Sequence, residues 1–242
     1  MKKQYKIHQL YTQIHWPSFF KDWNFDTEFT KIASLQGCDV VRASWLTEFE
    51  ESKRTKASEA MQLLKEANRM IDLLDRDYTI YIDSAEVAIK IENNILYADD
   101  TQINLDFLLK NKTHSTTPPL NEESLIKEIK SNRNITLFVS TTDSEMDLLF
   151  ENNPYKQKQV KTLTHRFTEA AAIHLQQEKN QGHDFIISHF DMTENTSIFL
   201  EWVKSKISFS NLGIATTQNN RLTPEATIIG FMLPKHLLIQ QK

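Results

Sequence analysis

The stretch ASEAMQLLKEANRMIDLLD, residues 57–75, has the most regular helical pattern in the chain. Its apolar residues recur at spacings of three and four and form one continuous stripe: Ala60, Leu63, Leu64, Ala67, Met70, Ile71 and Leu74. Ser58 is a suitable N-cap, so the helix is predicted to begin there. A stripe of this kind is typical of a helix that packs against a core.

Short strands are predicted directly after this helix. Residues 78–82 (YTIYI) and 86–91 (EVAIKI) carry apolar side chains at every second position. The polar ENN at 92–94 then turns the chain into 95–98 (ILYA). Such runs are typical of an antiparallel meander. Residues 111–124 hold two prolines among polar residues and are predicted to form a loop.

The second half of the chain mixes helices and strands in the same way. Helical patterns cover 122–130, 154–179 and 194–207, and strand patterns cover 134–141, 212–217 and 226–233. No linker and no internal repeat divides the sequence. Residues 1–242 are therefore predicted to form a single α+β domain, in which helices pack on an antiparallel sheet.

Composition narrows the class of protein. At 242 residues the chain is long enough to bury a sizeable core. A net charge of -4 without a long basic run argues against nucleic acid or an anionic membrane as the main partner. No signal peptide is visible, and no apolar stretch approaches the roughly 20 residues that span a bilayer. Cys38 is the only cysteine, which excludes a disulfide framework. We expect a cytoplasmic protein of bacterial type.

The common catalytic motifs are absent. With four glycines, the sequence contains no GxGxxG, GxxxxGK[ST] or GxSxG pattern, and it has no HExxH zinc motif. His183 and His189 flank DFIIS, but solvated or core-edge histidines explain them without a ligand. No catalytic residue and no metal ligand is predicted.

An aromatic segment near the start, IHWPSFFKDW at 14–23, calls for an explanation. It contains Trp16, Phe19, Phe20 and Trp23 within eight positions. Three interpretations are open: the edge of a core, a lid on a ligand, or a surface for a partner.

Four stretches together resemble the reactivation domain of cobalamin-dependent methionine synthase, the module with which that family binds S-adenosylmethionine. The entry segment is similar to the family's Ile-Asp-Trp-Thr-Pro-Phe-Phe signature, and EAMQLLKEANRMIDLL is similar to a family helix. The helix YKQKQVKTLTHRFTEAAAIHL matches at Tyr155, Val160, Lys161, Leu163, Arg166, Glu169 and Ala170. LTPEATIIGFML matches at Pro224, Ala226 and Gly230. The four stretches run in the family's order, from about residue 10 to residue 236.

The resemblance implies a fold and a ligand cleft. It implies that His15, Trp16, Pro224 and Ala226 lie at the cleft that takes the cofactor, with Trp16 either in the core or in the cleft wall. We expect Trp16, Phe19 and Phe20 to be largely buried. S-adenosylmethionine is the ligand that the resemblance implies. Cobalamin would sit on a partner, because the Asp-x-His-x-x-Gly motif of cobalamin domains is missing from this sequence.

The sequence also departs from the family pattern. The family's Arg-Pro-x-x-Gly-Tyr-Pro loop has no counterpart, since there is no Arg between Arg166 and Arg221 and no Pro between Pro154 and Pro224. His15 stands where the family has an acidic residue, and an imidazole cannot replace a carboxylate as the partner of an ammonium group.

Three functions remain open. The chain could be a binding module without chemistry, acting with a cobalamin-dependent methyltransferase or another corrinoid protein or methionine synthase fragment. It could be an active reactivation subunit, and hence a methyltransferase, that supports S-adenosylmethionine-dependent remethylation of cobalamin in a split methionine synthase. It could also keep the fold with an unrelated role.

Overall fold

The computed structural model describes residues 2–35, 39–110, 112–114, 133–179, 183–187, 194–218 and 221–233. The α-helices are α1 (Trp16–Asp22), α2 (Asp39–Thr47), α3 (Glu51–Asp77), α4 (Leu105–Lys110), α6 (Pro154–Glu178), α7 (Glu194–Lys206) and α8 (Phe209–Leu212). Three short 3-10 helices are η1 (Ile7–Gln13), η2 (Thr27–Ser34) and η3 (Ser144–Leu148). The predicted helix at 122–130, most of the predicted loop at 111–124, and the residues Cys38 and His189 lie outside the described residues.

The strands form one large and two small sheets. They are β1 (Lys3–Tyr5), β2 (Ile80–Ala88), β3 (Lys90–Glu92), β4 (Ile95–Ala98), β5 (Thr101–Asn104), β6 (Lys112–His114), β7 (Asn134–Thr142), β8 (His183–Ile187), β9 (Ala215–Thr216), β10 (Leu222–Thr223) and β11 (Ile228–Leu233). The large sheet has the order β1-β2-β7-β11-β8-β6, and all its neighbours are antiparallel. The predicted α+β class with an antiparallel sheet is confirmed.

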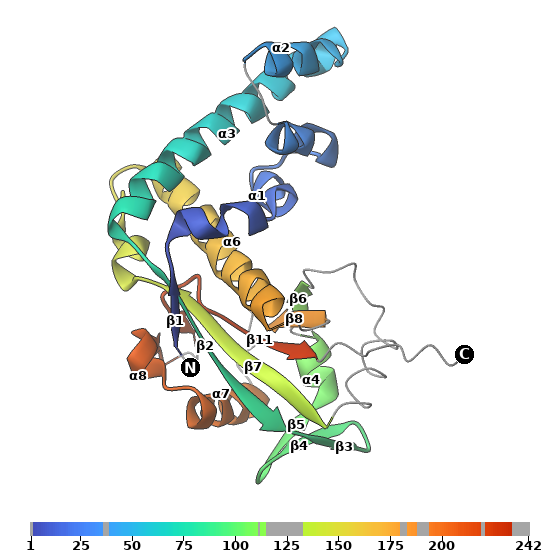
Figure 1. Ribbon diagram of the computed structural model, residues 1–242, viewed down its shortest axis with the longest axis vertical. Helices are drawn as coiled ribbons and strands as arrows, with labels where there is room; N and C mark the ends of the chain where they lie inside the picture. The colour runs from blue at the N-terminus through green and yellow to red at the C-terminus, as the bar shows by residue number, and fades with distance from the viewer. Residues whose placement is uncertain are drawn as a thin grey trace, which may run out of the picture.

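Helices cover both faces of the large sheet. Alternate residues of a strand point to opposite faces, and the two core clusters divide β7 and β11 in this way. Phe138, Ile228 and Met232 belong to the cluster that contains the buried residues of α3 and α6. Val139 and Phe231 belong to the cluster built with α7 and α8. Figure 1 shows α3 running from the sheet toward α2 at the far end of the molecule.

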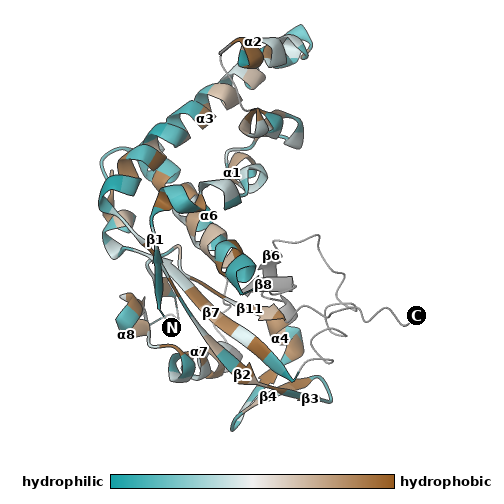
Figure 2. Ribbon diagram, viewed as in Figure 1, coloured by the Kyte–Doolittle hydropathy of each residue, from teal (hydrophilic) through white to brown (hydrophobic). Residues whose placement is uncertain are grey.

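The apolar stripes of the two long helices are buried on this side of the molecule, where α6 packs on β2, β7 and β11, and α3 packs on α6, η1 and η2. The predicted stripe of 57–75 is buried along its whole length, and Leu74 and Ala67 are fully inaccessible. In α6 three consecutive alanines, 170–172, are also inaccessible, and small side chains of this kind allow the helix to approach the sheet closely. Figure 2 shows the resulting mixture of hydrophobic and hydrophilic residues along α3 and α6.

Two details of the predicted strands are wrong. The strands predicted at 78–82 and 86–91 are mostly one strand, β2, because β2 pairs with β7 without interruption from Thr142 to Asn134. The predicted strand at 212–217 is only the two-residue β9. Ser208 accepts a hydrogen bond from the backbone N–H of Asn211, and Gly213 ends the short helix α8 in the left-handed conformation (φ 72°), so the first two residues of the predicted strand are the end of this helix and its cap.

Candidate functional site

The aromatic entry segment forms helix α1 and lies in the core. Pro17 occupies the first turn, where its missing N–H is not needed. Phe19 and Phe20 are inaccessible to solvent and Trp16 is 9% exposed. The rings of Trp16 and Phe19 meet edge to face at 5.5 Å. The expectation that Trp16, Phe19 and Phe20 are largely buried is confirmed, and all three belong to the core cluster.

His15 is the N-cap residue of α1. Its Nδ1 lies 2.8 Å from the hydroxyl of Ser18. Burial lowers the pKa of His15, and the positive charge of Arg166 lowers it further. Because the ordinary pKa of histidine is already near 6.5, the imidazole is neutral at pH 7.

Arg166 of α6 is the charged centre of this region. Its Nη2 lies 3.1 Å from Oε1 of Glu169 and 4.0 Å from Oδ2 of Asp22, the last residue of α1. The residue is 8% exposed, and its Nε and Nη1 are buried without a hydrogen-bond partner. Two carboxylates therefore face one guanidinium whose donors are only partly used.

The segment that begins the last strand is fixed to the same long helix at another point. Lys161 Nζ lies 2.9 Å from Oε2 of Glu225, between Pro224 and Ala226. The backbone N–H of Glu225 donates to Oδ2 of Asp147 at 2.8 Å. Burial raises the pKa of Asp147; the negative charge of Glu225 also raises it, against the lowering effect of this hydrogen bond. The side chain of Ala226 is buried.

The structure thus places the four predicted cleft residues against α6 in two groups. His15 and Trp16 adjoin the half that carries Arg166, and Pro224 and Ala226 adjoin Lys161 through Glu225. Within the described part of the chain, no hydrogen bond or ion pair joins the two groups. Neither Asp22 nor Asp147 was predicted, because each acquires its role from a residue distant in sequence.

Nothing in this region resembles a metal centre. Within the described ranges, no three His, Cys, Asp or Glu side chains gather as ligands of an ion would. The described helices also include none that is long and apolar enough to span a membrane.

The fold and this region define an α+β domain with a charged cluster on α6, the long helix that packs on the large sheet. The chain belongs to the family of vitamin B12 dependent methionine synthase activation domains, whose sequence model matches residues 6–184. That match includes His15, Trp16, Arg166 and Glu169 and ends before Pro224.

A solved structure supports the fold. The chain is similar to the protein described as "Crystal Structure of the MetH Reactivation Domain bound to AdoHcy", with a TM-score of 0.58 and 16% identity. The alignment covers 96% of this chain and 77% of that chain. At this identity the likeness concerns the fold alone. A search of curated proteins found no match.

Proposed function

We propose that the chain is a stand-alone binding module that docks onto a cobalamin-carrying protein, such as a methionine synthase fragment, and does not use S-adenosylmethionine. Membership of the activation domain family supports the choice of partner. The observation that carries the proposal is the internal pairing of Arg166 with Glu169 beside a neutral His15.

The charges explain why this region suits S-adenosylmethionine poorly. The ligand has an ammonium group that needs a free carboxylate and a carboxylate that needs a cation or N–H donors. His15 offers no negative charge. Glu169 and Asp22 face Arg166, so a ligand ammonium would have to compete with a guanidinium that is already in place.

A second candidate is the active reactivation subunit of a split methionine synthase. The same charged cluster supports this second candidate if its groups are considered as contacts for the ligand. Asp22 and Glu169 are carboxylates that face Arg166, and the unpartnered Nε and Nη1 of Arg166 are donors that a ligand carboxylate could accept from after local rearrangement. The chain would then bind S-adenosylmethionine while cobalamin stays on the partner.

One mixing experiment separates the two. The purified chain is combined with a cobalamin-loaded methionine synthase fragment that lacks its activation domain, and complex formation is followed by sedimentation velocity. The cobalamin absorbance spectrum is recorded with reductant, in the presence and absence of S-adenosylmethionine. We expect a complex that forms equally well without S-adenosylmethionine and yields no methylcobalamin.

Other outcomes contradict the proposal in different ways. Absence of a complex at about 10 μM of each protein would mean that docking onto a cobalamin protein is wrong. Methylcobalamin that appears only with S-adenosylmethionine would establish the reactivation subunit instead.

A further inference from the structure

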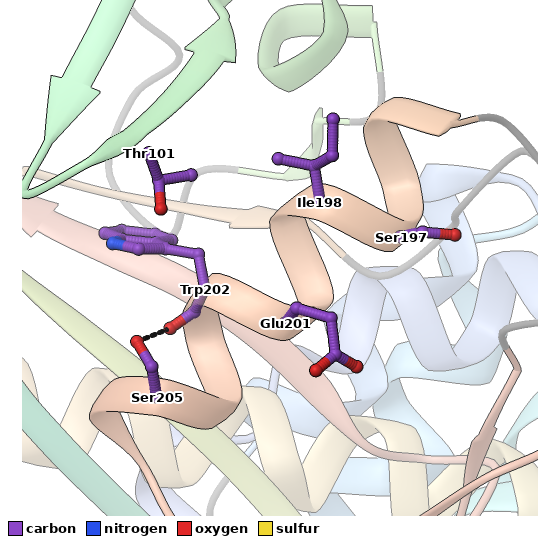
Figure 3. A pocket seen from close by; sticks show the side chains of 6 residues that line it. All are labelled: Thr101, Ser197, Ile198, Glu201, Trp202 and Ser205. Atoms are coloured by element: carbon purple, nitrogen blue, oxygen red, sulfur yellow. Dashed lines mark hydrogen bonds between the residues drawn. The ribbon is translucent and has the colours of Figure 1, made fainter.

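A hollow of about 470 Å³ opens on the other side of the large sheet, between α7 and the β4–β5 turn. It is lined by Thr101, Ser197, Ile198, Glu201, Trp202 and Ser205. Figure 3 shows Thr101 above the ring of Trp202, with Ile198 on the preceding turn of α7 and Glu201 nearby. Trp202 belongs to the cluster on the α7 face, whereas α6 and the Arg166 group lie on the opposite face. This hollow is therefore separate from the candidate site described above.

The floor of the hollow is aromatic and anchored. The ring of Trp202 stacks on Phe231 at 6.1 Å with an interplanar angle of 24°, and it contacts Phe199 at 6.0 Å. Ile198 at the rim is 40% exposed although it is large and apolar. An ion pair between Lys206 and Asp99 ties α7 to the β4–β5 turn, so both walls are held in place.

The polar groups are few and lie around this floor. Glu201 is 73% exposed and pairs with Lys204 along the helix at 2.8 Å. The hydroxyl of Ser205 donates to the backbone carbonyl of Trp202 at 2.6 Å. The indole Nε1 of Trp202 is buried without a hydrogen-bond partner, and buried donors in this state are uncommon. The hollow is open to solvent, and its apolar lining with a small number of polar groups suits a small molecule that binds weakly.

We propose that this hollow binds a small planar aromatic molecule that carries a positive charge. The aromatic ring would lie against Ile198, over the small exposed part of Trp202, which is 3% accessible. The cation would lie at the carboxylate of Glu201 and replace Lys204 there; this pair is exposed and so costs far less to break than the buried pair of Arg166 with Glu169. Because Glu201 is largely exposed, its charge sets a preference among ligands more than the total affinity.

The test uses three probes of nearly equal size: 2-phenylethylamine, which is cationic, 2-phenylethanol, which is neutral, and 3-phenylpropanoate, which is anionic. Binding to the whole chain is followed by the NMR resonance of the Trp202 indole N–H, with the other three tryptophans as internal references. We expect a saturable shift confined to Trp202, with a dissociation constant of about 1 mM for the amine. The affinity should fall in the order amine, alcohol, acid.

Two variants and a control make the assignment specific. Ile198→Ser should weaken all three probes, and its exposed position should leave the fold intact. Glu201→Gln should weaken the amine about two- to fivefold and leave the alcohol unchanged. Glu59→Gln removes an exposed carboxylate on α3 and should change nothing. The proposal is wrong if the amine gives no saturable Trp202 shift up to about 10 mM, or if amine and acid bind equally and Glu201→Gln has no effect.

Discussion

The guanidinium Nη2 of Arg166 lies 3.1 Å from Oε1 of Glu169, one turn further along α6, and the two side chains are only 10% and 13% exposed. An ion pair at this depth differs from a surface pair, because each charge has lost most of its water. Each charge compensates the other, and the removal of either partner would leave the remaining charge buried and unpaired.

Replacing Glu169 should therefore cost stability. Glu169→Gln leaves a buried guanidinium whose Nε and Nη1 already lack partners, and we expect the free energy of unfolding to fall by about 1–3 kcal/mol. Urea titration measures this difference. Glu201→Gln is the matched control, because Glu201 pairs with Lys204 at the same spacing of three residues but is 73% exposed. For Glu201→Gln we expect a loss of stability of less than about 0.5 kcal/mol. A loss as large as that of Glu169→Gln would mean that burial does not decide the effect.

The aromatic entry segment gives the second prediction. Phe20 is inaccessible and meets the rings of Phe19 and Phe25 edge to face at 5.8 Å in each case. Phe20→Ala should lower the free energy of unfolding by about 3–5 kcal/mol because it leaves a cavity as well as losing buried area. Leu148→Ala, at a leucine that is 65% exposed, should change it by no more than about 0.5 kcal/mol. A small loss of stability for Phe20→Ala would instead indicate that this segment is a surface for a partner.

The burial of the aromatic residues in this segment and the helix at 57–75 could both be predicted from the sequence, for a common physical reason. Both patterns are local: apolar residues at helical spacing point to one side, and that side must be buried. The N-terminal end of α3 was missed because ESKRTK, residues 51–56, carries no such stripe. Lys53 in this part pairs with Glu28 of η2 at 2.9 Å, a contact with a residue distant in sequence that a helical periodicity does not contain.

The candidate site was predictable to a smaller degree. The resemblance located His15 and Trp16 on an N-terminal segment that does lie against the helix of Arg166, and it marked Arg166 and Glu169 within a matching helix. It gave no indication that Asp22 approaches Arg166, or that Asp147 accepts the backbone N–H of Glu225. Such contacts join residues 144 and 78 positions apart, and no spacing rule along one chain contains them.

A pH dependence follows from the contacts between β1 and the end of α6. Burial acts to raise the pKa of Glu178, but hydrogen bonds from Lys3 at 2.8 Å and Tyr5 at 2.6 Å outweigh it, so the pKa lies below the ordinary value of 4.5. A carboxyl whose pKa is lowered on folding contributes stability that is present above its unfolded pKa and lost as the pH falls through the folded pKa. Stability should therefore decline as the pH drops below 4.5.

The hydroxyl of Tyr5 is the part of this effect that mutation can isolate. Tyr5→Phe removes the hydrogen bond, so thermal denaturation from pH 6 to pH 3 should show a shallower decline than in the unchanged chain. At pH 7 the variant should lose about 0.5–1.5 kcal/mol. Tyr97→Phe, in β4, should keep the original slope. Parallel curves for the chain and Tyr5→Phe would show that Glu178 does not depend on this contact.

The last prediction concerns S-adenosylmethionine and separates the two proposed functions. A ligand with an ammonium and a carboxylate gains about 1.5–3 kcal/mol from each charge-assisted hydrogen bond. Here His15 is neutral, and Asp22 and Glu169 face Arg166. At least two such contacts are therefore missing or require that an existing ion pair be broken. A deficit of roughly 3–6 kcal/mol corresponds to two to four orders of magnitude in affinity. Isothermal titration calorimetry should therefore detect no binding at micromolar concentrations.

The variant His15→Asp sharpens this test. Aspartate is a favourable N-cap for α1 and brings a carboxylate close to Arg166, so the variant should fold at least as stably as the unchanged chain. The new carboxylate restores one contact of the two that are missing, and the dissociation constant should remain above the micromolar range. Ser18→Ala, which removes the hydroxyl partner of His15 without adding charge, is the control. Micromolar binding by the unchanged chain would mean that Asp22 or Glu169 leaves Arg166 to meet the ligand's ammonium, and it would favour the active reactivation subunit over the binding module.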